Sequence, residues 1–194
     1  MTRPPPARKP QAGVELLHAG SAGQGWRGRV RDADDGRAVA GARIAIERRG
    51  FNGVDTVVQA WSDEQGAFTM PGTATAMGDE IVAEGQHHAL LRGPAPGAGE
   101  LDIALVLRKR ALLDRLVRWA RDRGAPFDVR PEATPGHVRR AAGNEFPVAR
   151  WADAVERAAY GGQPVDAAAQ AEVDGLAPAA VDGPAEDRKG DPKA

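Results

Sequence analysis

The 194-residue chain contains no cysteine and few aromatic residues, and its charges are almost balanced. The absence of cysteine excludes disulfides, thiolate zinc sites, iron–sulfur ligation and thiol catalysis. Aromatic residues make up 5% of the chain, so a core must consist mainly of Val, Leu, Ile and Ala. The 26 Lys and Arg against 27 Asp and Glu do not favour a nucleic-acid partner, because such proteins normally carry a basic excess.

A long hydrophobic run is also missing. The sequence has no stretch of about 18 apolar residues that could span a membrane. Its N-terminus is positively charged, but no apolar region follows that would make a signal peptide. The sequence therefore predicts a soluble, cytoplasmic protein.

The two ends of the chain are poor in hydrophobic pattern. Residues 1–24 are rich in Pro, Gly and Ala, which predicts a disordered N-terminal arm. Residues 163–194 form an acidic, Ala- and Pro-rich tail, predicted to be mostly disordered apart from a weak helix from Asp166.

Residues 25–107 show short runs of period two separated by turn residues. On the last run, Leu101, Ile103, Leu105 and Leu107 share one face. Six short strands without a helix between them favour an antiparallel β-sandwich. The expected strands cover residues 27–31, 43–48, 55–61, 67–70, 80–84 and 101–107.

The hydrophobic period changes to 3.6 in residues 108–162, which predicts a small helical unit. A first helix is expected at 109–123, with Gly124 just past its end. Thr134 and Pro135 supply an N-cap and a first-turn proline for a second helix, and a third follows at 147–160. The predicted class is therefore mainly β, a sandwich followed by a helical unit, with disordered termini.

Several short motifs lie within about residues 26–107. They are Gly28-Arg29-Val30, Asp35-Gly36-Arg37-Ala38-Val39, Gly41-Ala42-Arg43-Ile44-Ala45-Ile46 and Ser62-Asp63-Glu64-Gln65-Gly66-Ala67-Phe68. Together they resemble the carboxypeptidase regulatory-like domain, which is a transthyretin-like β-sandwich. The resemblance implies a non-catalytic module that accompanies other proteins for folding, spacing or docking.

Two features stand out in residues 108–165, namely Thr134-Pro135 at the start of a short helix and the run from Trp151 to Gly161. With them, this part resembles an uncharacterised bacterial domain, usually found after membrane spans in proteins of transglutaminase-like and MoxR ATPase clusters. This resemblance implies a place in a bacterial assembly.

Candidate catalytic and metal-binding residues do not form a known pattern. Asp32, Asp34 and Asp35 lack the spacing of a calcium loop and are expected to form a solvated turn. His87 and His88 would point to opposite faces of a strand, and all four histidines are expected at the surface. No nucleophile or phosphate-loop motif is present. The sequence therefore predicts no enzyme activity, no cofactor and no metal.

One cluster of charge exceeds the background, in the predicted helix at 108–123. It has seven basic residues against two acidic ones. One interpretation is a solvated face that the acidic tail neutralises. The other is a basic helix that docks on an acidic protein or an anionic membrane, with Trp119 at the interface. The candidate interaction residues are Arg108, Lys109, Arg115, Arg118, Trp119 and Arg121.

Three hypotheses of function follow. The first is a non-catalytic interaction or scaffolding module that binds a protein. The second is an accessory domain for carbohydrate or peptide, which requires a concave face with exposed aromatic residues or paired carboxylates. Trp26 and Trp61 are the aromatic candidates for it, although the core is the expected place for both. The third is a peripheral membrane binder that acts through residues 108–123.

Overall fold

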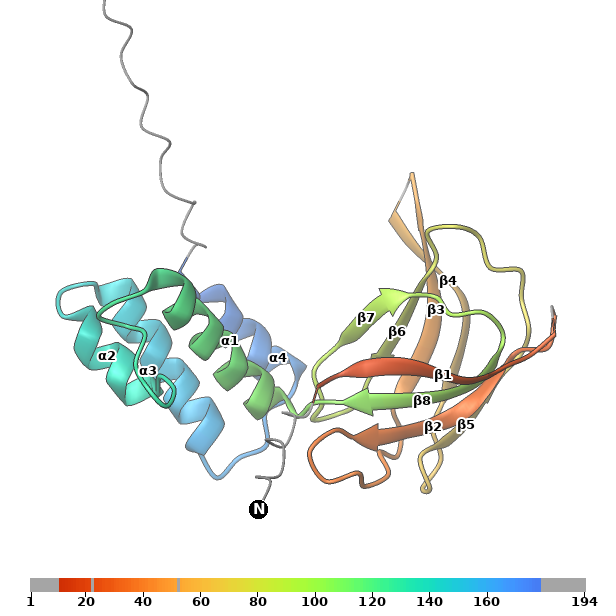
Figure 1. Ribbon diagram of the computed structural model, residues 1–194, viewed down its shortest axis with the longest axis horizontal. Helices are drawn as coiled ribbons and strands as arrows, with labels where there is room; N and C mark the ends of the chain where they lie inside the picture. Colours follow the sequence, from red (N-terminus) through yellow and green to blue (C-terminus); the bar gives the residue numbers. More distant parts are fainter. Residues whose placement is uncertain (1–10, 22, 52, 179–194) are drawn as a thin grey trace, which may run out of the picture. The chain divides into compact units, whose positions relative to one another are not determined.

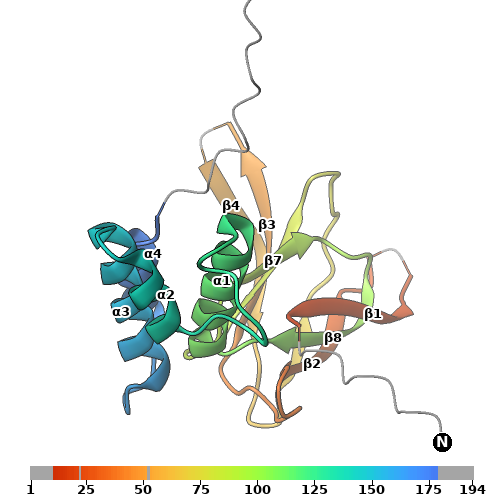
Figure 2. The same cartoon turned by 60° about the vertical axis from the view of Figure 1, so that its left-hand side comes forward.

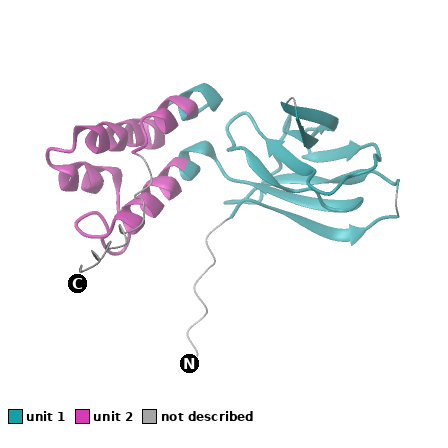
Figure 3. Ribbon diagram, turned by 90° about the horizontal axis from the view of Figure 1, so that it is seen from above, with its two compact units in different colours: residues 1–111, 163–170 teal, residues 112–162, 171–194 magenta. Residues whose placement is uncertain are grey.

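The computed structural model describes residues 11–21, 23–51 and 53–178. The chain divides into two compact units, shown in different colours in Figure 3. The first unit comprises residues 1–111 and 163–170, and the second comprises residues 112–162 and 171–194. The boundary at residue 111 lies inside a helix, so the two units share one element.

The first unit contains two four-stranded sheets (Figure 1). The strand order of the first sheet is β1-β8-β2-β5, and that of the second sheet is β4-β3-β6-β7. The strands of the first sheet are β1 (Gly13–Ala19), β2 (Trp26–Asp32), β5 (Ala67–Met70) and β8 (Gly99–Leu105). The strands of the second sheet are β3 (Arg43–Gly50), β4 (Gly53–Trp61), β6 (Glu80–Glu84) and β7 (Leu91–Pro94).

Most neighbouring strands are antiparallel, which confirms the predicted mainly-β sandwich. The exception is the pairing of β2 with β8, which is parallel from Trp26↔Gly99 to Asp32↔Leu105. A hairpin turn forces its two strands to be antiparallel. The chain between β2 and β8 instead contains all the strands from β3 to β7, so no turn fixes the relative direction of β2 and β8.

The core of the first unit lies between the two sheets and follows the alternation of the strands. Ile44 and Ile46 on β3 are buried, and so are the predicted residues Leu101, Ile103 and Leu105 on β8. The same core takes the large side chains of Trp26, Met70 and Ile81, together with Phe68 and Val30. Residues between these positions along each strand point away from the core.

Two strands were not predicted from the sequence. Residues 13–19 do not belong to a disordered arm, because β1 pairs with β8 from Gly13↔Ala104 to Ala19↔Gly99. The other missed strand is β7, which pairs with β6. Both lie at sheet edges and carry few buried side chains, so no alternating hydrophobic pattern marks them in the sequence.

The helices match the prediction closely. They are α1 (Arg108–Arg123), α2 (Pro135–Ala142), α3 (Phe146–Tyr160) and α4 (Ala167–Gly175). Thr134 caps α2, since its side chain accepts a hydrogen bond from the backbone N–H of His137 at 3.2 Å. In Figures 1 and 2, α2 and α3 lie side by side. Among the described helices, none combines the length and apolar character that crossing a bilayer requires.

The second unit has its own small core around an aromatic cluster. Trp119 of α1 meets Trp151 of α3 edge to face, with ring centres 5.4 Å apart. Trp119 also packs against Phe127 at 5.1 Å. The other buried residues of this core include Leu112, Leu116, Ala120, Val138, Ala142, Val148 and Val155.

Candidate functional site

The structure divides the basic residues predicted as one docking surface. Arg108 is buried, and its guanidinium donates hydrogen bonds to Glu84 and Gln170, both at 2.6 Å. Lys109 is half-buried. Arg115 is exposed but forms an ion pair with Asp174, a residue of the C-terminal tail. Acidic neutralisation by the tail, the first of the two interpretations, therefore applies at Arg115.

The remaining members of that set differ in their exposure. Trp119 was predicted at an interface, but its ring packs between Phe127 and Trp151 in the core of the second unit. Arg118 and Arg121 are exposed, and they are what remains of the predicted basic face. The sequence pattern was misleading here because the seven basic residues of this helix, at 3.6 residues per turn, are spread around its axis rather than gathered on one face.

Two residues expected at the surface meet inside the first unit. The Nε2 atom of His88 lies 3.0 Å from a carboxylate oxygen of Asp32, and both side chains are almost fully covered. The other oxygen of Asp32 accepts a hydrogen bond from the backbone N–H of Asp34 at 2.7 Å. Asp32 thus closes the turn after β2, while His88 comes from the segment after β6, a contact that local sequence cannot reveal. Within the described residues, no group of three or more His, Asp or Glu is arranged to hold a metal ion.

The two tryptophans proposed as a binding pair differ in their exposure to solvent. Trp26 is buried in the sandwich, as predicted, and its indole N–H donates to the carbonyl of Gly97 at 3.0 Å. Trp61 was also expected in the core, but it is exposed at the end of the edge strand β4. The exposed aromatic pair that would favour a carbohydrate binder is therefore not formed.

The first sheet instead carries a hollow that the sequence analysis missed. Two adjoining depressions, with volumes of about 530 and 450 Å³, share Arg27, Thr69 and Glu100 as lining residues. We call them together the trough. Its further lining includes His18, Gln24 and Pro71 in the first depression, and Leu17, Arg29, Ala67 and Asp102 in the second. These residues come from all four strands of the first sheet and their flanking segments.

Two glycines that line the first depression stand where the backbone is tightly packed. A Cβ atom on Gly25 would lie 2.2 Å from the carbonyl oxygen of Met70, and one on Gly72 would lie 2.1 Å from that of Gly23. The backbones approach so closely that only glycine fits at these two positions.

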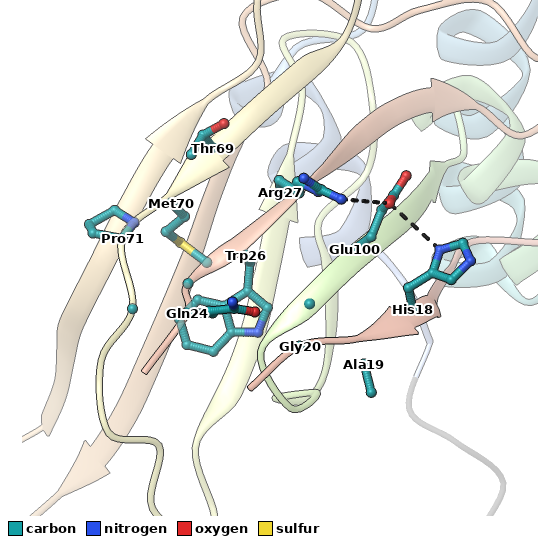
Figure 4. A pocket seen from close by; sticks show the side chains of 13 residues that line it. His18, Ala19, Gly20, Gln24, Trp26, Arg27, Thr69, Met70, Pro71 and Glu100 are labelled. Atoms are coloured by element: carbon teal, nitrogen blue, oxygen red, sulfur yellow. Dashed lines mark hydrogen bonds and ion pairs between the residues drawn. The ribbon is translucent and has the colours of Figure 1, made fainter. Parts of the chain in front are cut away.

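Charged side chains line the trough in cross-strand pairs. Arg27 on β2 and Glu100 on β8 are register partners, and their side chains lie 3.4 Å apart (Figure 4). The Nδ1 atom of His18 lies 3.6 Å from the same carboxylate. The Arg27 side chain is 74% exposed, so this pairing is loose and open to solvent.

A tighter pair stands at the far end of the same face. Arg31 contacts Asp102 through two nitrogens, at 2.7 and 2.8 Å. The hydrogen bond to Asp102 raises the pKa of the Arg31 guanidinium above its ordinary value, and the nearby Glu15 adds to that effect. The outward face of β2 therefore holds one tightly paired arginine, one loosely paired arginine and, between them, Arg29.

A signal for this site existed in the sequence, although it was spread over the chain. Arg27, Arg29 and Arg31 alternate with core residues along one strand, and Glu100 and Asp102 do the same along another. Only the pairing of β2 with β8 brings these alternating charges together. That pairing has no local sequence mark, so the site could not be assembled from motifs.

Comparisons with known proteins do not assign the chain to a family. No family model matches it, and no curated protein matches its sequence. Among solved structures, it is similar to a DUF3823 family protein from Parabacteroides merdae ATCC 43184, with 11% identity and a TM-score of 0.32. That similarity covers 46% of this chain and 48% of the other.

A second similar structure is a 9R-lipoxygenase from Cyanothece PCC8801, also with 11% identity and a TM-score of 0.32. It is matched over 79% of this chain but only 27% of its own length. The chain thus spans less than half of either solved protein. Likenesses at this level carry no conclusion about function, which must come from the site itself.

Proposed function

We propose that this protein is a non-catalytic interaction module that binds a protein partner through the trough on its first sheet. The observation that carries the proposal is the hollowed outward face of this sheet, where Arg27 and Arg29 are exposed and incompletely paired. Concave surfaces with a few convergent polar groups are the usual form of a binding site. The helical residues Arg118 and Arg121 line neither of the two depressions.

The resemblance to the carboxypeptidase regulatory-like domain belongs to the same proposal. Its motifs hold the positions that such a sandwich requires: Ile44 and Ile46 enter the core, and Phe68 follows a tight turn into it. In that family the sandwich serves other proteins and has no reaction of its own. We extend this role to the present chain, together with its place in a bacterial assembly.

Matched variants of the full chain test which surface binds. One double variant removes charge in the trough, Arg27→Ala with Arg29→Ala, and the other removes charge on α1, Arg118→Ala with Arg121→Ala. All four arginines are exposed, so both variants should unfold at the wild-type temperature. Each protein is used as bait in lysate of the source organism, and the captured proteins are quantified by mass spectrometry.

We expect a partner that the wild type and the α1 variant retain and that the trough variant loses. Loss from the α1 variant alone would return recognition to the basic helix and overturn the proposal. The proposal also fails if the trough variant captures everything that the wild type captures.

A further inference from the structure

The three arginines on β2 differ in how their charge is compensated. Arg31 is held by Asp102, and Arg27 lies near Glu100. Arg29 has Asp102 as its register partner on β8, but that carboxylate is taken by Arg31. Within the described part of the chain, Arg29 is exposed and forms no ion pair or side-chain hydrogen bond. Arg29 is therefore the one guanidinium of these three that no carboxylate of the described residues contacts.

The opposite side of Arg29 is open. On β5, its register partner is Ala67, and that of Arg27 is Thr69. Neither side chain is large enough to cover a guanidinium, and both line the trough. The carboxylates of β8 thus flank the arginines on one side, while the other side leaves room for a ligand. A carboxylate placed there would accept paired hydrogen bonds from Arg29 and a further one from the Thr69 hydroxyl.

The spacing of the two arginines sets a second condition on the ligand. Arg27 and Arg29 are two residues apart on one strand and share its outward face, so their backbone positions differ by about 6.6–6.8 Å. Alternate side chains of an extended peptide repeat at the same distance. A sheet face lined in this way can therefore meet acidic side chains at positions i and i+2 of a peptide that runs along β2.

We propose that the trough binds an extended acidic peptide segment, with carboxylates at alternating positions that pair with Arg27 and Arg29. This inference rests on the proposed function and specifies its ligand. The match is one of charge, because Arg29 lacks a partner, and of spacing, because the arginines repeat at the period of an extended chain. Among the described residues that line the trough, no Phe, Tyr or Trp ring is exposed for a sugar to stack on, since Trp26 in the first depression and Phe68 in the second are both buried.

Three fluorescein-labelled peptides of equal length test the charge and the spacing separately. The first, Gly-Thr-Glu-Thr-Glu-Thr-Gly, carries glutamates at i and i+2. The second, Gly-Thr-Glu-Glu-Thr-Thr-Gly, places them on opposite sides of an extended chain, and the third replaces both by Gln. Fluorescence anisotropy with the full chain at low salt measures binding, because exposed ion pairs are screened as salt increases.

We expect the alternating peptide to bind about fivefold to tenfold more tightly than the adjacent one, and the Gln peptide to bind more weakly than both. Arg29→Ala should weaken the alternating peptide about tenfold, with Arg29→Lys in between because lysine lacks the planar fork. Arg49→Ala is the matched control, since Arg49 is an exposed arginine on β3 of the other sheet. It should leave the affinity unchanged.

Equal affinity for the three peptides, or for wild type and Arg29→Ala, would overturn the acidic-peptide inference. Oligogalacturonate is the comparison ligand, because it presents carboxylates on a sugar chain. If it binds in an Arg29-dependent manner while the peptides do not, the ligand is a glycan and this inference fails. The capture experiment with the trough variant then decides independently whether the proposed protein-binding function also fails.

Discussion

The outward faces of the two sheets both carry arginines beside carboxylates, but the arginines are paired to different extents. On the second sheet, Arg43 and Arg92 both bind Glu47, at 3.3 and 2.8 Å, and Glu47 keeps only 10% of its side chain exposed. On the first sheet, Arg27 reaches Glu100 loosely and Arg29 has no partner among the described residues. Arginine on a sheet face is therefore not a mark of a binding site by itself. The difference lies in whether the chain already supplies the anion.

A test of this comparison begins beneath the trough, on β5. Phe68 points into the core and is 4% exposed, while its neighbour Thr69 lines the trough. Phe68→Ala should lower the free energy of unfolding by about 3–5 kcal/mol, because it leaves a cavity in the core. Urea unfolding of this variant beside Thr69→Ala measures it. If both variants lower the free energy of unfolding equally, the assignment of Phe68 to the core face of β5 and of Thr69 to its outward face is wrong.

The ion pairs of Arg43 and Arg92 on the second sheet should depend strongly on the Glu47 carboxylate that both arginines contact. Glu47→Gln removes the charge that Arg43 and Arg92 both contact, and we expect a loss of about 2–3 kcal/mol in the free energy of unfolding. This is below the cost for fully buried pairs, because both guanidinium groups are about one third exposed. Chemical denaturation at pH 7 provides the measurement, and an effect below about 0.5 kcal/mol would place this network with ordinary surface pairs.

The ion pair of Arg48 on β3 with Asp79, the residue before β6, makes the stability of the fold depend on pH. Hydrogen bonds from Arg48 and from the backbone of Ala76 lower the pKa of Asp79 to about 2. In the unfolded chain an aspartate has a pKa of about 3.9. The ionised carboxylate thus stabilises the fold fully above pH 4, and this contribution is lost as the pH falls toward 2.

Asp79→Asn should therefore melt below the wild type at pH 7, and the two melting temperatures should converge between about pH 4 and pH 2. Circular dichroism melts at a series of pH values follow the convergence. A constant difference down to pH 2 would show that the amide disturbs the loop for a reason other than charge.

The smallest effect is expected in the trough itself. Glu100→Gln should change the free energy of unfolding by less than about 0.5 kcal/mol, because its partners Arg27 and His18 are largely exposed. The same denaturation experiment as for Glu47→Gln makes the two values directly comparable. A large loss in the free energy of unfolding for Glu100→Gln would mean that the arginines of the first sheet are paired as firmly as those around Glu47.

The sequence was sufficient for elements whose stability is encoded locally. Period two placed β5 and β6 at their observed bounds, and Thr134, Pro135 and Gly124 marked helix ends correctly. It was insufficient where a partner far along the chain decides the outcome. β1 depends on β8, and the predicted docking residue Arg108 is buried against Glu84.

The candidate site falls in the second category. Arg29 stands in the motif Gly28-Arg29-Val30, but that motif does not mark it as a binding residue, since it becomes distinctive only when Arg31 takes Asp102 from it. Trp61 illustrates the opposite error, because a large apolar residue at the end of a strand was expected inside and lies on an exposed edge. Strand order, rather than composition, decides both cases.

The parallel pairing of β2 with β8 has a consequence for how the molecule is made. During synthesis, β3 with β4 and β6 with β7 emerge as neighbours and can pair soon after leaving the ribosome. β1 must wait for β8, its partner in the sheet, which is translated last of all the strands, whereas β2 can pair earlier with β5. Until Leu105 has emerged, the surface that later forms the trough is incomplete, and the nascent chain carries β1 without its partner strand.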